Sequence, residues 1–179
     1  MPAGLCGHCQ HDPPVFTATT AALHYRPPAD YLVQRLKFSG ELALAPLLAA
    51  LLAERLGRRE LPLPERLIPV PLHHSRLRER GFNQAMEIAR VLGRRLELPV
   101  DRRLCRRIRR TGTQSLLPVK SRRRNVRNAF VLNSTLRARH VAIVDDVMTS
   151  GHTANELARV LQRAGVETIE VWVIARAGR

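Results

Sequence analysis

The stretch that decides the fold is VAIVDDVMTSGHT, residues Val141–Thr153. Its first four residues are apolar and predict a buried central strand, and the two acids Asp145 and Asp146 follow at the carboxyl end of that strand. A short turn then opens an amphipathic helix, which we predict over 153–164. In open α/β sheets, ligands bind beyond the carboxyl ends of the strands, so we expect a binding site at this turn.

The residue types of the turn suit the two ends of a ribose 5-phosphate. A helix N-terminus offers backbone N–H groups and a partial positive charge to a phosphate. Hydroxyl donors and a glycine that permits close approach strengthen this cradle, which we predict at Thr149, Ser150, Gly151, His152 and Thr153. The acid pair suits vicinal ribose hydroxyls and Mg²⁺. The simpler alternative is that the two acids merely end the strand and cap the helix. The full order of apolar strand, acid pair, hydroxyl- and glycine-containing turn and helix is more specific than either of these roles.

Other known phosphate motifs do not fit this turn. The glycine and lysine spacing of a P-loop is absent, and so is the Gly-x-Gly-x-x-Gly pattern of dinucleotide-binding folds. The sequence therefore predicts a sugar-phosphate site of a different kind.

Apolar strands and helices alternate on both sides of this stretch. Asn83 is an expected N-cap for a helix over 84–96, and a polar basic loop is expected over 73–81. We predict further strands at 17–25, 66–71, 98–104, 129–132 and 168–175, and helices at 30–38 and 41–59. This pattern predicts an α/β fold with a mainly parallel central sheet and helices on both faces.

Charge is the strongest feature of the composition. The chain has 179 residues and a formal net charge of +15, and 45% of its residues are hydrophobic, enough for a real core. Between Arg102 and Arg139 there are 13 Lys or Arg residues and no acid. A solvated basic surface is one interpretation, and a face that binds small phosphorylated ligands or a nucleic-acid backbone is the other. A long loop over 106–127 is typical of a functional segment.

The N-terminal region differs from the rest. Residues 1–16 contain Cys6-Gly-His-Cys9 and a proline pair, and we expect a small cysteine-containing module there, ahead of a main domain over 17–179. The chain has only three cysteines, no secretory leader pattern and no apolar run of the ~20 residues that span a membrane, so we expect a cytoplasmic protein.

The turn at 145–153 resembles the phosphoribosyl diphosphate (PRPP) motif of type I phosphoribosyltransferases. The rest of the chain resembles the competence-associated ComF/GntX branch of that group, from about Cys6 to Arg176. The matching stretches are YLVQRLKFSG (31–40), IPVPLH (68–73), RLRERGFNQ (76–84), TQ (113–114), RRNV (123–126) and AF (129–130).

The resemblance implies a type I phosphoribosyltransferase fold with a mobile hood loop over the site. It implies that Asp145 and Asp146 are the catalytic acids, contacting ribose hydroxyls and Mg²⁺, and that the turn after them binds the 5-phosphate. The implied pyrophosphate loop contains His73, His74, Ser75 and Arg76. The implied hood loop, which is also the candidate nucleic-acid surface, contains Arg109, Arg110, Lys120, Arg122, Arg123 and Arg124.

Members of the branch commonly begin with a zinc ribbon made of two Cys-x-x-Cys pairs. This chain has one such pair, Cys6 and Cys9, so a zinc site there would need further ligands. His8 and His11 lie nearby without a standard spacing. One pair is a weak signal for Zn²⁺.

Three functions stay open on the sequence. The first is Mg²⁺-dependent phosphoribosyl transfer from PRPP to an unknown acceptor. The second is a non-catalytic module that binds single-stranded DNA through its basic face. Such a module would act with other proteins in DNA uptake and recombination. The third is a PRPP-sensing regulator. Only Phe130 is aromatic between Arg102 and Arg139, so DNA binding would depend on backbone electrostatics.

Overall fold

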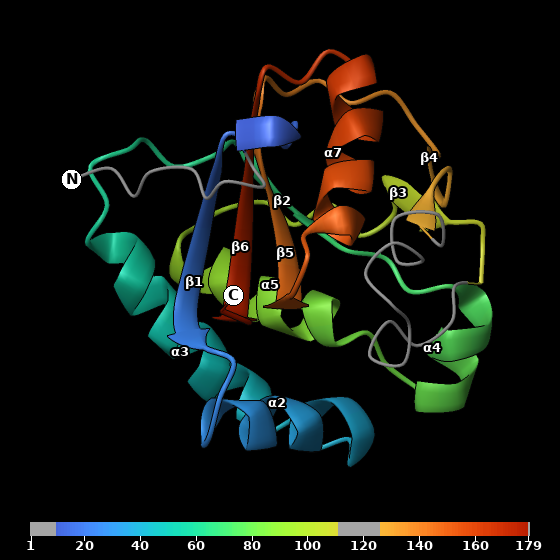
Figure 1. Cartoon of the computed structure of the whole chain (residues 1–179). Coiled ribbons are helices and arrows are strands. Elements are labelled where there is room, and N and C mark those ends of the chain that lie inside the picture. Colours follow the sequence, from blue (N-terminus) through green and yellow to red (C-terminus); the bar gives the residue numbers. More distant parts are fainter. Residues whose placement is uncertain (1–9, 111–125, 179) are drawn as a thin grey trace.

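The computed structural model describes residues 10–110 and 126–178 and contains a four-stranded sheet (Figure 1). Its strands are β1 (Ala18–His24), β2 (Arg66–Pro69), β5 (His140–Met148) and β6 (Thr168–Arg176), in the order β1-β6-β5-β2. Every neighbouring pair is parallel. The predicted α/β class and parallel sheet are confirmed.

Helices cover both faces of the sheet. On one face lies α7 (His152–Arg163), and on the other lie α2 (Ala29–Phe38), α3 (Leu44–Gly57) and α5 (Gln84–Arg95) (Figure 1). Side chains of β5 alternate between the two layers: Val141 and Ile143 pack in the cluster that contains α7, and Ala142 and Val144 in the cluster that contains α3 and α5. A strand buried on both faces needs apolar residues at every position, which explains the continuous run at 141–144.

Local signals set the ends of these helices. The Asn83 side chain accepts a hydrogen bond from the Ala85 N–H at 3.0 Å, which confirms the predicted cap of α5. The predicted helices at 30–38, 41–59 and 153–164 are present with boundaries shifted by a few residues.

Two predictions near the site were wrong. The segment 73–81 is not a loop but contains the helix α4 (His74–Arg80), in which the His73 ring caps the first turn and Gly81, at φ +83°, ends the last. No residue of α4 is buried, so it lacks the apolar spacing that identifies a helix.

The segment 98–104 is not a strand, and only an isolated bridge joins Leu67 and Val100. The strand begins only after this segment: β3 (Cys105–Arg107) pairs antiparallel with β4 (Phe130–Leu132). These two strands form a small second sheet beside the main one. The predicted strand at 129–132 therefore exists but does not belong to the central sheet.

Several predicted residues lie outside the described ranges. These are Cys6, Cys9, Lys120, Arg122, Arg123 and Arg124. Where the description begins, the chain is attached to the main sheet: the Val15 N–H donates to Asn155 Oδ1 at 2.7 Å, and the Thr17 N–H donates to the Ile169 carbonyl at 2.7 Å. Among the described residues, none of the helices has the length and apolar character needed to span a bilayer.

Candidate functional site

A cleft of about 170 Å³ opens at the carboxyl ends of β2 and β5. Elements far apart in the sequence build it: the end of α2, the loop after β2, helix α4, strand β3 and the end of β5. The residues that line it are Lys37, Phe38, Val70, Leu72, His73, Arg76, Arg80, Gln84, Arg107, Asp145, Asp146, Val147 and Thr153. Both predicted acids are therefore in a cleft at the predicted edge of the sheet.

The two acids are in unequal surroundings. Asp146 is only 3% exposed, and its Oδ2 accepts a hydrogen bond from Lys37 Nζ at 2.8 Å. Its backbone N–H donates to Asp145 Oδ1 at 2.9 Å. Burial alone would raise the pKa of Asp146, but the charge and the hydrogen bond of Lys37 outweigh burial and lower this pKa. Lys37 is likewise penalised by burial, and Asp146 restores its charge and raises its pKa.

Asp145 is the acid whose charge is poorly compensated. Burial raises its pKa well above the ordinary value, and the neighbouring charge of Asp146 raises it further, against a smaller opposing effect of Lys37. A bound cation would favour the ionised form of Asp145 and so bring its pKa back down. The described residues contain no cluster of three or more His, Cys, Asp or Glu. Mg²⁺ usually takes one or two carboxylates and completes its shell with ligand oxygens and water, so this acid pair fits Mg²⁺.

Cations surround the acid pair. Arg76 and Arg80 lie one helical turn apart on α4 and both line the cleft. Arg107 comes from β3, and a β-bridge between Arg107 and His73 fixes it beside the loop after β2. Burial lowers the pKa of Arg80 and of Arg107, but arginine stays charged in proteins. The cleft thus offers three guanidinium groups, which suit a pyrophosphate.

The turn after the acids has the features of an anion cradle. Gly151 has φ +75°, and helix α7 begins after it without a side-chain cap. A small cavity of about 20 Å³, lined by residues 145, 147–149, 151–154, 171 and 173, adjoins the cleft. The Ser150 hydroxyl oxygen is buried and has no hydrogen-bond partner within the described part of the chain. A buried hydroxyl without a partner is costly, which leaves Ser150 able to bond an anion at this turn, although Ser150 lines neither the cleft nor the small cavity.

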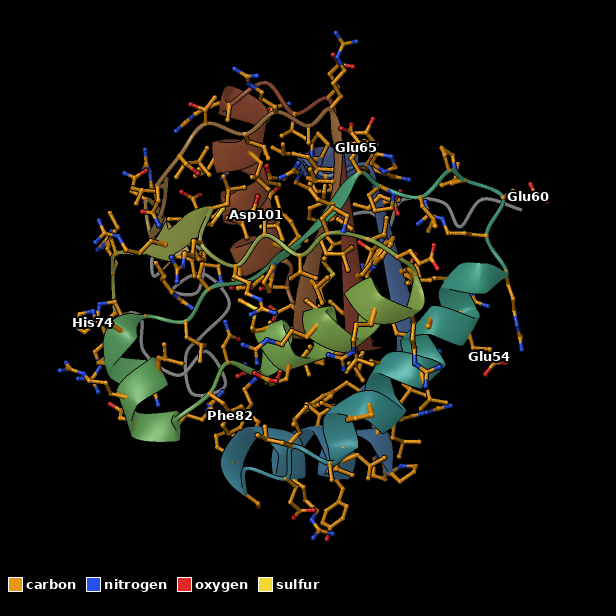
Figure 2. All side chains as sticks on the ribbon, turned by 180° about the vertical axis from the view of Figure 1, so that it is seen from behind. Glu54, Glu60, Glu65, His74, Phe82 and Asp101 are labelled. Carbon is orange, nitrogen blue, oxygen red and sulfur yellow. The ribbon has the colours of Figure 1, made fainter. Side chains whose placement is uncertain are left out.

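The four residues of the predicted pyrophosphate loop lie in different surroundings. His73 and Arg76 line the cleft. Ser75 is held by His73, because its hydroxyl lies 2.8 Å from His73 Nδ1. His74 is exposed on the outer side of α4 and does not line the cleft (Figure 2). Burial lowers the pKa of His73, and the nearby His74 and Arg107 lower it further, so the ring is held neutral.

The described arginines of the predicted hood loop do not reach the cleft. Arg109 Nη1 donates to the Arg127 carbonyl at 2.8 Å, and Arg110 Nη2 lies 3.1 Å from Glu79 Oε1. Both side chains are exposed.

Three charged residues of the cleft were not identified from the sequence: Lys37, Arg80 and Arg107. Lys37 is 109 positions from its partner Asp146, and no local pattern connects the two. The i, i+4 spacing of Arg76 and Arg80 was a usable signal, but only for a segment predicted as a helix. Arg107 lies in a stretch that contains many other arginines, and no feature of the sequence distinguishes it from them.

The sequence of this chain is similar to those of known proteins. Residues 77–179 match the model of the phosphoribosyl transferase domain. The chain is 41% identical to Competence protein F of Haemophilus influenzae over 96% of this chain and 78% of the relative. It is 39% identical to DNA utilization protein YhgH of Escherichia coli K12, over 96% and 77%. It is 25% identical to Competence protein ComFC of Streptococcus pneumoniae, over 79% and 60%.

The family match agrees with the parallel sheet flanked by helices. The family model covers more than half of the chain, and relatives at about 40% identity cover nearly all of it. The chain belongs to the competence-associated ComF family and carries the phosphoribosyltransferase-like domain of that family.

Proposed function

We propose that the chain binds PRPP with Mg²⁺ in the cleft at the end of β5. One observation carries this proposal: a single short turn joins an acid pair, of which Asp146 is buried and Asp145 half-buried, to a helix N-terminus without a side-chain cap, beside a cleft lined by cations. A phosphoribosyl ligand has hydroxyls between two anionic groups.

Each part of the ligand has a counterpart in the cleft. The turn Thr149–Thr153 would hold the 5-phosphate through backbone N–H groups and the Ser150 hydroxyl. The carboxylates of Asp145 and Asp146 would accept the two ribose hydroxyls. Arg76 and Arg107, which line the cleft with His73 beside them, would bind the pyrophosphate.

Phosphoribosyl transfer is the reaction that this arrangement supports best. The bond between C1 of the ribose and the pyrophosphate oxygen breaks, its electron pair leaves with pyrophosphate, and the acceptor forms the new bond to C1. Arg76, Arg80 and Arg107 would stabilise the negative charge that develops on the leaving group. The ionised acid pair would stabilise positive charge on the ribose ring. Mg²⁺, held by Asp145 and Asp146, would supply further positive charge for the pyrophosphate.

Calorimetric titration tests the binding step. We expect PRPP to bind the wild-type protein with Mg²⁺ and much more weakly with EDTA. Asp145→Asn together with Asp146→Asn should abolish the Mg²⁺-dependent part while the protein stays folded by circular dichroism. Unchanged PRPP affinity in this double variant would remove both acids from the site. A panel of nucleophiles with pyrophosphate detection then tests transfer, and binding without pyrophosphate release would favour a PRPP sensor.

Single-stranded DNA is a second candidate ligand, because the basic charge is displayed at the surface. The exposed arginines of the segment around β3 and β4 are Arg102, Arg103, Arg106, Arg109, Arg110 and Arg127. Two of the relatives are named for competence and one for DNA utilization. Without aromatic side chains to stack bases, binding would follow backbone electrostatics and weaken steeply with salt.

The salt dependence of DNA binding tests this candidate. Replacing Arg122, Arg123 and Arg124 by glutamine should weaken binding of an oligothymidine and flatten the slope of log affinity against log salt by up to about 0.7 for each lost phosphate contact. Replacing Arg94 and Arg95 on α5 is the matched control for a two-charge test variant, Arg122→Gln with Arg123→Gln alone. If the wild type fails to bind at low salt, the chain is not a DNA-binding module.

A further inference from the structure

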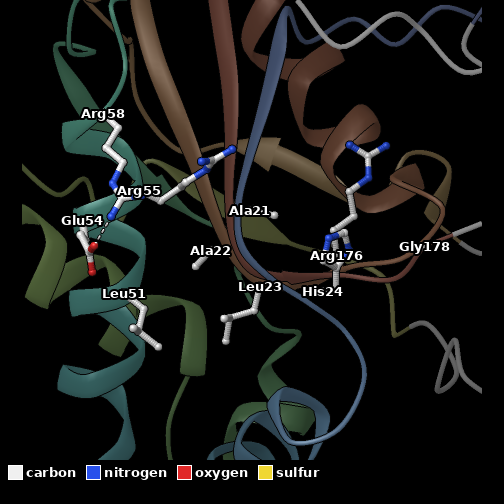
Figure 3. Close-up of a pocket in the computed structure, with 10 residues that line it drawn as sticks. All are labelled: Ala21, Ala22, Leu23, His24, Leu51, Glu54, Arg55, Arg58, Arg176 and Gly178. Carbon is white, nitrogen blue, oxygen red and sulfur yellow. Dashed lines mark hydrogen bonds and ion pairs between the residues drawn. The ribbon is translucent and has the colours of Figure 1, made fainter.

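A second and larger concavity lies at the opposite edge of the sheet from β2, between β1 and α3 (Figure 3). Its volume is about 700 Å³, and none of its lining residues also lines the cleft at β5. The groove is formed by Ala21, Ala22, Leu23, His24, Leu51, Glu54, Arg55, Arg58, Arg176 and Gly178. The proposed function uses none of these residues.

The strand that forms one wall has an open edge. β1 pairs only with β6 among the described strands. The N–H groups of Thr17 and Tyr25 donate to carbonyls of β6, at 2.7 and 2.8 Å. Backbone groups alternate in direction along a strand, so those of Thr20 and Ala22 face away from β6. They form a row of donors and acceptors that an added strand would satisfy.

This edge lacks the features by which proteins usually block strand addition. β1 reads ATTAALH, with no proline, lysine or acidic residue. Ala22, Leu23 and Leu51 form an apolar floor beside it, and all three are only half-buried. An extended chain on this edge would point alternate side chains onto that floor.

The rim of the groove is basic. Arg55 extends from α3 toward β1, and Arg176 lies with His24 at the other end (Figure 3). Arg58 is paired with Glu54 at 2.5 Å, but Arg55 and Arg176 form no ion pair with any residue that the structure describes. The local charge therefore favours an anionic occupant.

We propose that the β1 edge binds an extended, acidic segment of a partner protein by strand addition. The open backbone edge suits a polypeptide. The aliphatic floor suits apolar side chains at alternate positions of that polypeptide, and the unpaired arginines suit acidic residues between those positions. A nucleic acid fits less well, because the groove has no Phe, Tyr or Trp on which bases stack. A second copy fits less well, because it would bring two chains of net charge +15 together at their arginines.

Peptide binding tests this surface on the full chain. The probe is a fluorescent, blocked eight-residue peptide of alternating glutamate and valine, measured by anisotropy. One control peptide has lysine for glutamate, and another keeps every glutamate but is N-methylated at alternate amides. We expect both controls to bind at least about tenfold more weakly. Equal binding of the N-methylated peptide would show that charge alone attracts the probe, and would overturn strand addition.

Matched variants locate the probe. Arg55→Glu should weaken binding about fivefold or more, while Arg94→Glu, an equal charge change at the end of α5, should alter it less than twofold. Hydrogen exchange should slow at Thr20 and Ala22 and stay unchanged at 149–153. Equal effects of the two variants, protection elsewhere, displacement by an oligonucleotide, or a stable dimer that excludes the probe would each refute the proposal.

Discussion

Replacing Lys37 by methionine removes the partner of the buried acid Asp146. Methionine keeps most of the side-chain length and its apolar contacts, so the change is mainly the loss of a charge. Asp146 is 3% exposed and has its Oδ2 2.8 Å from Lys37 Nζ. The variant leaves a buried carboxylate next to another acid, Asp145, without its ion pair, and only the longer-range attraction of Arg80 remains.

The structure sets the size of the effect. Two unit charges at this separation attract by about 6 kcal/mol at an effective dielectric constant of ~20, before the cost of desolvation. Exposed pairs contribute less than about 1 kcal/mol, and the loss of one partner from a buried pair costs about 3–5 kcal/mol. The Lys37 side chain is 29% exposed, so this pair lies between the two classes. We expect Lys37→Met to lower the free energy of unfolding by about 2 kcal/mol at pH 7.

The sign of the pH dependence follows from both partners. Asp146 has a lowered pKa, so its contribution is present above the ordinary value of 3.8 and is lost as pH falls through the folded-state pKa. Lys37 has a raised pKa, so its contribution is complete below 10.5 and is lost as pH rises through its folded-state pKa. The deficit of the variant should therefore be largest between about pH 4 and pH 10, and shrink below pH 4.

Urea unfolding followed by Trp172 fluorescence measures this deficit, because Trp172 is the one tryptophan of the chain and is fully buried. Lys37→Arg is the control, since it keeps a cation beside Asp146 and should lose much less stability. A deficit below about 0.5 kcal/mol at pH 7, or one that does not change between pH 7 and pH 3.5, would refute this account of the acid pair.

Two substitutions in the turn give further predictions. Ser150→Ala removes a buried hydroxyl that has no partner within the described residues, so the free protein should be unchanged or up to about 1 kcal/mol more stable, while PRPP binding weakens severalfold. A clear loss of stability in urea would contradict it. Gly151→Ala should cost about 1–2 kcal/mol, because Gly151 has φ +75° and a Cβ there would lie 3.2 Å from Met148 Cε. It should also weaken PRPP binding in calorimetry, and unchanged values of both would refute the cradle geometry.

Much of the fold could be predicted because the local signals agree with the tertiary structure. The apolar run at 141–144 is a central strand, and the Asn83 cap begins α5 as expected. The failures have physical reasons. Helix α4 has no buried residue and so has no apolar stripe to reveal it. The segment at 98–104 resembles a strand because Leu98 and Val100 are apolar at alternate positions, and they pack against the α5 side of the core although only one bridge joins the segment to the sheet.

From the residues alone, the candidate site was predictable only where its residues are contiguous, whereas His73 and Arg76 were identified through the family resemblance. Asp145, Asp146 and the turn to Thr153 follow one another in the chain, so their order could be read as one motif. Lys37 and Arg107 reach the same cleft from α2 and β3, and tertiary packing alone brings them to the acids. Sequence separation therefore decided which site residues were identified.

The position of bound PRPP is the most direct test of the central claim. In a titration of ¹⁵N-labelled protein with PRPP and Mg²⁺, we expect the largest amide shifts at Ser150–Thr153 and at the two acids, and almost none at β1. Shifts confined to other regions, or no saturable shift at the turn, would contradict the claim that β5 and α7 clasp a sugar phosphate between them.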